Sequence, residues 1–424
     1  MVKNSSTNDL NLSKNDAYSF RENLNPFFKF PIMKKFNPYN VKFYSLHSGF
    51  KNKKEDLLIA LFKKAVPVAA IYSKTSTPSA PIIWDKKNNF GLCKVLIVNS
   101  GNANAHTGKK GIIAIDKYAA IASKVFKCPL SQILVSSTGV IGEQLDFNKI
   151  INQLNNFKYK KDNDLLSAAK AIMTTDTFPK TCIKIIKYKS TEIRIFGFAK
   201  GSGMIAPNMG TMLAYIFIEA NISRKELKNL ITTHKESTFN SITVDGDTST
   251  SDTLMLFSID NDKKILKTNQ IIFNKISKAV KDVMFNLSQN IISDGEGISK
   301  IIEINVIKAK NYKQASSVAF SVGNSLLVKT AIAGQDANWG RIIMAIGKAD
   351  KDIIQNKIKL SFDKFTVATN GQIYEKINYK KLENYMTRKK IQINIELGLG
   401  IYKRTVFSSD LTHEYVTINA DYRS

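Results

Sequence analysis

Short apolar runs that favour β-strands recur along the chain, and several of them adjoin loops rich in glycine, serine and threonine. Such runs stand at residues 95–98, 133–136, 193–198 and 212–218, and the loops beside them include "VNSGNANAHTGKKG", "SSTGVIGEQL" and "AKGSGMIAPNMG". Apolar runs of this length bounded by turn residues are typical of buried strands. Residues 112–126 have helical spacing instead. This alternation predicts a mixed α/β chain in which loops that could carry chemistry are spread along the whole length.

Further segments fit the same pattern. Residues 57–62 and 66–72 predict short strands or one strand pair, and residues 149–170 predict a mixture of helix and polar loop. Ser223 stands three residues before Glu226, which predicts a capping box at the start of a helix. A chain of 424 residues exceeds one small core, so we expect one large domain or two closely packed ones. Residues 1–35 are interpreted as a loose extension before the folded part.

The formal charge of +27 raises the question of a nucleic-acid or anionic-membrane partner. The lysines are dispersed among Asn and Ile, with no aromatic stacking platform and no recognisable nucleic-acid module. We therefore expect no nucleic-acid partner, although the charge could steer small anionic substrates. A basic binding protein without enzymatic activity stays as an alternative. It predicts one intact chain of 47.4 kDa and salt-sensitive binding of nucleic acid.

Three cysteines and four histidines are scattered without metal-ligand spacing: Cys93, Cys128, Cys182, His47, His106, His234 and His413. An odd number of distant cysteines is no disulfide framework and predicts a reducing compartment. We expect no metal and no bound cofactor. The longest apolar run, residues 212–218, is far shorter than the ~20 residues of a membrane-spanning helix. Residues 1–35 lack the apolar core of a signal peptide, so the expected location is the cytoplasm with no membrane partner.

Gly210 and Thr211 place a small residue and a hydroxyl directly before the run "TMLAYIFI". A hydroxyl beside an open peptide carbonyl can attack it and form an ester that water then hydrolyses. The freed threonine carries an α-amine with a reference pKa of ~7.7–8, which can deprotonate the adjacent hydroxyl. On spacing alone, an ordinary threonine at the start of a strand is the commoner interpretation. Self-cleavage between Gly210 and Thr211 is the alternative.

Other polar loops offer the remaining parts of an acyl-transfer site. In "SSTG", residues 136–139, a hydroxyl and a glycine N–H suit an oxyanion, although a simple Ser/Thr turn fits as well. Residues 245–253 lack the arrangement of a calcium loop and predict a network of polar turns beside the site. Glu296 stands between glycines in "SDGEG", where its carboxylate could meet a substrate ammonium or close a turn.

Eight motifs in order give the chain a family resemblance. It resembles the glutamate N-acetyltransferases, also called ornithine acetyltransferases, from about residue 36 to the end. The matching segments are "VNSGNANAHTG", "SSTGVIGE", "AIMTTDTFPK", "AKGSGMIAPNMGTML", "SITVDGDTSTSDT", "DGEGISK", "VKTAIAGQDANWGRI" and "DLTHEYVTINADYRS".

The resemblance implies an α/β fold with stacked sheets and helices, and an N-terminal-nucleophile enzyme that cuts itself between Gly210 and Thr211. Residues 36–210 then form an α chain and residues 211–424 a β chain, assembled as two α and two β chains. It implies acetyl transfer from N2-acetylornithine to glutamate through an acetyl-threonine, in the cyclic route to arginine. It also leaves open acetyl-CoA as a further acetyl donor.

Site residues carry over motif by motif. Thr211 matches the nucleophile, and Thr138 with Gly139 matches the oxyanion donors. The family's substrate contacts match Thr174, Lys200, Glu296, Asn419 and Ser424, together with Thr211 itself. Lys200 and hydroxyl donors suit the shared α-carboxylate of ornithine and glutamate, and Glu296 suits the side-chain ammonium of ornithine.

Some positions depart from the family pattern. Gly210 stands where alanine is usual, His106 where cysteine is common, and Gln335 and Ala337 replace the usual Glu and Pro. These departures leave the cleavage rate, the substrate preference and the use of acetyl-CoA open. A related N-terminal-nucleophile aminopeptidase or amidohydrolase is the alternative enzyme, since it would also cut itself and acylate Thr211, with water as the acceptor.

Overall fold

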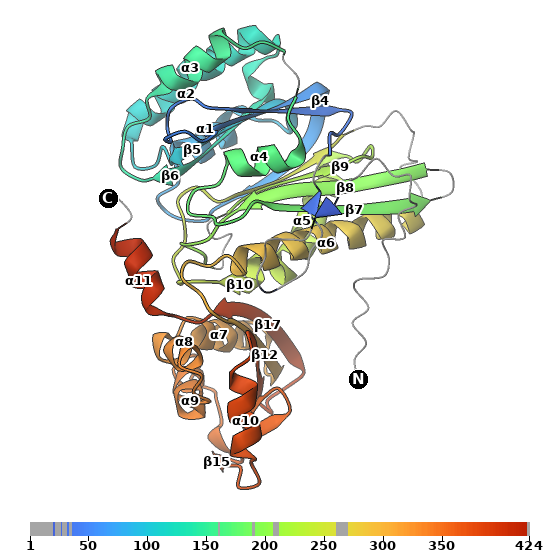
Figure 1. Ribbon diagram of the computed structural model, residues 1–424. Helices are drawn as coiled ribbons and strands as arrows, with labels where there is room; N and C mark the ends of the chain where they lie inside the picture. The colour runs from blue at the N-terminus through green and yellow to red at the C-terminus, as the bar shows by residue number, and fades with distance from the viewer. Residues whose placement is uncertain are drawn as a thin grey trace.

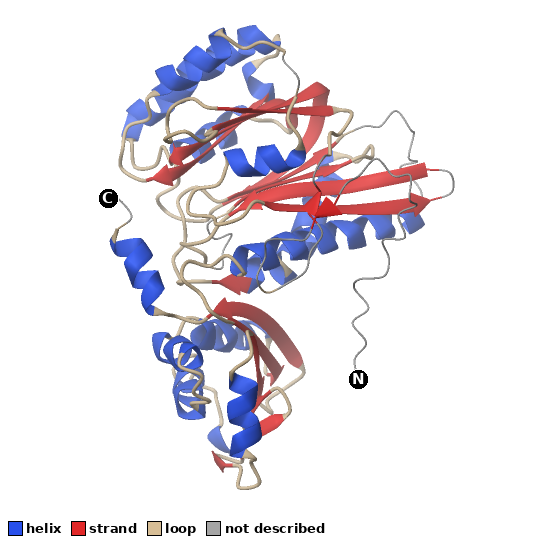
Figure 2. Cartoon of the chain, in the orientation of Figure 1, coloured by secondary structure: helices blue, strands red, loops and turns tan. Residues whose placement is uncertain are grey.

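The computed structural model describes residues 20–21, 27, 32–33, 36–159, 162–188, 191–206, 212–259 and 270–421. Figure 1 shows helices packed on two large sheets, with the C-terminal part of the chain forming a smaller body below the rest. Figure 2 shows the same layers by secondary structure. The predicted mixed α/β architecture of stacked sheets and helices is confirmed. No helix in the described ranges combines the length and the apolar character needed to cross a membrane.

The larger sheet has eight strands. They are β3 (Val41–Leu46), β4 (Leu57–Tyr72), β5 (Leu92–Asn102), β6 (Ile133–Val140), β7 (Lys180–Tyr188), β8 (Thr191–Lys200), β9 (Leu213–Ile218) and β11 (Thr253–Ser258). Their order is β6-β5-β4-β11-β9-β8-β7, and β3 pairs with β4. The strands β9 and β11 therefore lie between β4 and β8. Segments from both sides of residue 211 share one sheet, so the expected α and β chains do not correspond to separate spatial domains.

The long strand β4 joins the two halves of this sheet. Its first half pairs with β3 and β5, and its second half pairs with β11. The register with β5 shifts between Leu61 and Val66, at the exposed residues Lys63 and Lys64. The two short strands expected from the sequence are thus one strand with a bulge. A bulge bends a strand and increases its twist, which lets one strand serve both halves.

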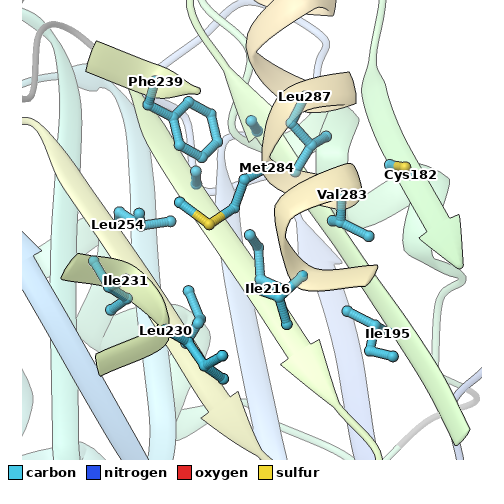
Figure 3. Packing of buried hydrophobic residues seen from close by; sticks show 14 of the residues in the cluster. Cys182, Ile195, Ile216, Leu230, Ile231, Phe239, Leu254, Val283, Met284 and Leu287 are labelled. Atoms are coloured by element: carbon cyan, nitrogen blue, oxygen red, sulfur yellow. The ribbon is translucent and has the colours of Figure 1, made fainter. Parts of the chain in front are cut away.

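Helices cover the outer face of each half of the larger sheet. The helices α1 (Ala80–Asn88), α2 (Gly108–Phe126) and α3 (Phe147–Asn155) pack on one half, and α5 (Arg224–His234) and α6 (Gln270–Ile292) pack on the other. The short helix α4 (Leu165–Ala171) packs in the core between the halves. Figure 3 shows Met284 and Leu287 of α6 packed near Ile216 of β9. The expected capping box of Ser223 and Glu226 is present at the start of α5.

A second sheet forms the C-terminal body. It contains β10 (Ile242–Thr243), β12 (Ile301–Ala309), β13 (Lys359–Phe362), β14 (Phe365–Thr369), β15 (Gln372–Ile373), β16 (Lys390–Glu396) and β17 (Tyr402–Ser409). The helices α7 (Tyr312–Gly323), α8 (Leu326–Ala333), α9 (Trp339–Gly347) and α10 (Tyr379–Met386) accompany it, and α11 (His413–Ala420) follows. Within the expected extension 1–35, the short strands β1 (Phe20–Arg21) and β2 (Ile32–Met33) pair with each other.

Candidate active site

A cavity of about 310 Å³ brings together loops from the larger sheet and from the segments after α6 and in α11. Its lining includes every predicted oxyanion and substrate residue that the structure describes: Thr138, Gly139, Thr174, Lys200, Glu296 and Asn419. These residues span 282 positions of sequence, from 138 to 419, when both ends are counted. The remaining predicted residues, Gly210, Thr211 and Ser424, lie outside the described residues.

Thr138 and Gly139 lie near the end of β6, which runs parallel to β5. Gly139 has a φ of +131°, and a Cβ built there would stand 2.3 Å from the carbonyl carbon of Gly101. Only glycine fits this close approach of two backbones. Gly139 therefore allows the end of β6 to line the cavity while β6 remains paired with β5.

Lys200 is the last residue of β8 and is only 4% exposed. Its Nζ donates to Oγ1 of Thr138 over 3.2 Å. A hydroxyl that accepts this bond still has its own proton to donate. Burial lowers the pKa of Lys200, while the nearby carboxylates of Asp176, Asp252 and Glu296 oppose that shift.

Glu296 and Asn419 line the same cavity and contact each other. Asn419 Nδ2 donates to Oε2 of Glu296 over 2.9 Å, and Glu296 is 8% exposed. A Cβ at Gly203 would lie 2.4 Å from the same Oε2, so the absence of a side chain at residue 203 makes room for the carboxylate. The structure thus presents one carboxylate, already held by an amide, on the wall of the cavity.

The helix α11 brings Asn419 to this position although none of its residues is buried. The hydroxyl of Thr412, which caps the helix, donates to the carbonyl of Gly297. Gly297 has a φ of +65°, and a Cβ there would stand 2.4 Å from the nitrogen of Tyr415. The loop that carries Glu296 therefore packs directly on the backbone of α11, and this close contact requires glycine at residue 297.

Lys180 connects three loops of the cavity. The sequence motifs did not predict a role for it. Its Nζ donates to Asp176 over 2.6 Å and to Asp294 over 2.5 Å, and its side chain is fully buried. Asp176 also accepts from the N–H groups of Thr174 and Gly201. One ammonium thereby fixes the loops that carry Thr174, Lys200 and Glu296.

The charges and the burial of this network shift the pKa of both carboxyls. Burial alone would raise the pKa of Asp176, but the charges of Lys180 and Lys200 and the Gly201 N–H hold it well below its usual range. For Asp294, burial outweighs Lys180 and raises the pKa. The spacing of Asp176 and Lys180 is visible in "DTFPK", but their pairing with Asp294 crosses 114 positions and has no local signal.

The loop at residues 245–253 lies beside the site as expected. Ser249, Thr250 and Ser251 line the cavity. Asp252 follows them and is 1% exposed. Its Oδ1 accepts the N–H of Met212 over 2.9 Å, so this loop contacts the residue that follows Thr211 in the chain. Among the described residues, no cluster of three or more His, Cys, Asp and Glu could hold a metal ion.

Comparison with known proteins places this site in a family. The model of the ArgJ family matches residues 42–424. The protein named arginine biosynthesis bifunctional protein ArgJ from Bradyrhizobium diazoefficiens is 42% identical over 392 residues, which is 91% of this chain and 95% of that protein. Its namesake from Bartonella henselae is 41% identical over 389 residues, with the same coverage.

A solved structure of arginine biosynthesis bifunctional protein ArgJ from Bacillus halodurans is also similar, at 32% identity with a TM-score of 0.45. It covers 49% of this chain and 98% of that one. The match to the family model and the identity to curated relatives extend over the motifs and the cavity residues described above. The chain therefore belongs to the ArgJ family, an acyltransferase family of arginine biosynthesis, as its motifs predict.

Proposed function

We propose that this chain moves acetyl from N2-acetylornithine to glutamate through an acetyl ester on Thr211, releasing ornithine and N-acetylglutamate. The observation that carries the proposal is the single cavity lined by all six described residues that were assigned to the oxyanion and the substrate. Those residues come from separate segments and meet only in the fold. Family membership over residues 42–424 supports the same activity.

The chemistry begins with self-cleavage between Gly210 and Thr211. The freed α-amine of Thr211 then takes the proton of its own hydroxyl, and Oγ1 attacks the acetyl carbonyl. The Thr138 hydroxyl and the Gly139 N–H donate to the oxyanion. The carbon–nitrogen bond to ornithine breaks, and ornithine leaves with the proton. The amine of glutamate then attacks the acetyl ester, which returns the proton to Thr211.

The charged groups of the cavity suit the two substrates. Ornithine and glutamate share an α-carboxylate, for which the Lys200 ammonium and the Thr174 hydroxyl are donors. The Glu296 carboxylate, held by Asn419, suits the side-chain ammonium of ornithine. Ser424 is proposed as a further substrate contact.

Several features of the enzyme belong to the same proposal. Residues 36–210 and 211–424 become an α and a β chain, and two of each assemble. Acetyl-CoA is proposed as a second acetyl donor for glutamate, and the cytoplasm as the location. No bound cofactor is needed, because the threonine carries the acetyl group.

The proposal is tested by incubating the purified protein with N2-acetylornithine and glutamate and following N-acetylglutamate. Transfer to glutamate that outpaces acetate release supports it. Release of acetate at the same rate with and without glutamate would indicate the alternative hydrolase, in which water is the acceptor. A parallel incubation with acetyl-CoA and glutamate tests the second donor.

Glu296→Gln is expected to raise the KM for N2-acetylornithine about 10- to 100-fold, because a hydrogen bond to a charged group contributes roughly 1.5–3 kcal/mol. Self-cleavage should proceed as in the wild type, since glutamine keeps an oxygen for the Asn419 amide. The measurement is steady-state kinetics beside a gel of the cleaved chains. Glu414→Gln, an exposed change at the start of α11, is the control. Equal losses of cleavage and of binding would make Glu296 a structural residue.

A further inference from the structure

Asp252 holds a buried carboxylate oxygen that has no partner among the described residues. The residue is 1% exposed, and its Oδ1 accepts the Met212 N–H over 2.9 Å. Oδ2 accepts no hydrogen bond of good geometry from the described part of the chain, although the Ser249 hydroxyl lies near the carboxyl. A buried carboxylate oxygen without a donor is costly, so a structure that keeps one calls for an explanation.

Two parallel strands hold this carboxyl against Met212, the residue that follows Thr211 in the chain. Asp252 directly precedes β11, as Met212 directly precedes β9, and Leu213 pairs with Thr253. Thr253 N–H also donates to the Met212 carbonyl over 2.9 Å. The backbone nitrogen of Ser73 donates to the Asp252 carbonyl. The backbone of Asp252 is therefore held by Ser73 and by the pairing of Thr253, and this fixes the position of the carboxyl.

Covalent geometry limits the distance between the Met212 nitrogen, which Asp252 contacts, and the atoms of Thr211 that are proposed to react. Three bonds join the Met212 nitrogen to the Thr211 nitrogen, and their lengths sum to ~4.3 Å. The Thr211 nitrogen therefore lies within ~4.3 Å of an atom that Asp252 already contacts. The Asp252 carboxyl therefore contacts the residue that directly follows the peptide bond proposed to break.

We propose that the Asp252 carboxyl carries the proton during self-cleavage. As Thr211 Oγ1 attacks the Gly210 carbonyl carbon, the hydroxyl proton passes to the carboxylate. When the bond between the Gly210 carbon and the Thr211 nitrogen breaks, the same proton passes to that nitrogen. The products are an ester and a free amine, with no net gain or loss of protons. Water then hydrolyses the ester and restores the hydroxyl. This inference rests on the proposed function.

The environment suits a carboxylate that must accept a proton. Burial raises the pKa of Asp252 well above its usual range, and this effect outweighs the Met212 N–H, the charge of Lys200 and the nearby Ser249 hydroxyl. A general base works best when its pKa approaches the working pH. An ordinary exposed aspartate would be a weaker base for a threonine hydroxyl.

Asp252→Asn is the direct test, because the amide oxygen can still accept the Met212 N–H while the proton carrier is lost. Self-cleavage should slow by on the order of 100-fold or more, the usual contribution of a general acid–base group. The full chain is purified, and the fraction of intact 47.4 kDa protein is followed over time by mass spectrometry. Thermal unfolding checks that the variant is folded.

Asp85→Asn is the matched control. Asp85 is also 1% exposed, accepts one backbone N–H, from Val135 over 3.0 Å, and has a pKa raised well above its usual range by burial. It lies on α1, and its hydrogen bonds come from Val135 and from the Tyr72 hydroxyl, over 3.3 Å, rather than from Met212. The control should cleave at the wild-type rate, so a general effect of removing a buried carboxyl is separated from proton transfer.

The outcomes separate this inference from the proposed function. Wild-type cleavage at Thr211 with an equally fast Asp252→Asn variant would overturn the role of Asp252 and leave the acetyl-transfer proposal intact. A wild-type chain that never cuts would contradict the proposed function itself. If Asp252→Asn does not fold, Asp252→Ala with added formate decides. Cleavage that rises with formate supports the proton carrier, and no response to formate overturns it.

Discussion

Thr211→Ala is expected to leave one uncut chain of 47.4 kDa and to abolish acetyl transfer. The substitution removes the oxygen that attacks the Gly210 carbonyl and later carries the acetyl group. Loss of a nucleophile that acts with its own base typically costs on the order of 10⁴- to 10⁶-fold in kcat. Gel electrophoresis of the purified chain and the rate of N-acetylglutamate formation measure the two effects.

Thr211→Ser is the companion variant. Serine keeps the hydroxyl and, after cleavage, the α-amine, so both cutting and transfer should persist at altered rates. The pair separates the chemistry of the oxygen from the shape of the side chain. An uncut Thr211→Ala chain that still transfers acetyl at the wild-type rate would contradict the nucleophile assignment.

Lys180→Met is expected to lower the free energy of unfolding by about 3–5 kcal/mol, because removing one partner of a buried ion pair leaves uncompensated charge. Here the ammonium bridges two buried carboxylates, Asp176 and Asp294. The loops with Thr174 and Glu296 should also lose their relative placement, so the KM for N2-acetylornithine should rise. Denaturant unfolding and steady-state kinetics measure these effects.

Lys310→Met is the control for that variant. Lys310 pairs with Asp352 over 3.0 Å, but both side chains are about half exposed, at 59% and 48%. Exposed pairs of this kind contribute about 0–1 kcal/mol. If the two variants destabilise the protein equally, the buried network does not hold the site as described.

Local signals allowed part of the fold to be predicted. The capping box of Ser223 and Glu226 and the helical spacing of residues 112–126 are contained in a few consecutive residues, and both appear in the structure. The helix α2 begins at Gly108, four residues before the expected start, inside the glycine-containing loop. The division of residues 57–72 was wrong because two exposed lysines interrupt the apolar pattern without ending the strand.

Long-range pairings could not be predicted in this way. The position of β9 and β11 between β4 and β8 depends on which strands pair in the sheet. The hydrophobic periodicity of a strand does not specify its pairing partner. The same holds for Asp252 and Met212, which are 40 positions apart. Family motifs supplied the cavity residues because they were matched one by one, whereas the ion-pair network of Lys180 needed the structure.

The most direct test of the central claim is the mass of each fragment after brief incubation with N2-acetylornithine alone. The fragment beginning at Thr211 is predicted to become heavier by one acetyl group, and added glutamate should remove this group as N-acetylglutamate forms. An active enzyme whose Thr211 fragment never gains acetyl, or whose acetyl group remains when glutamate is added, would contradict the account.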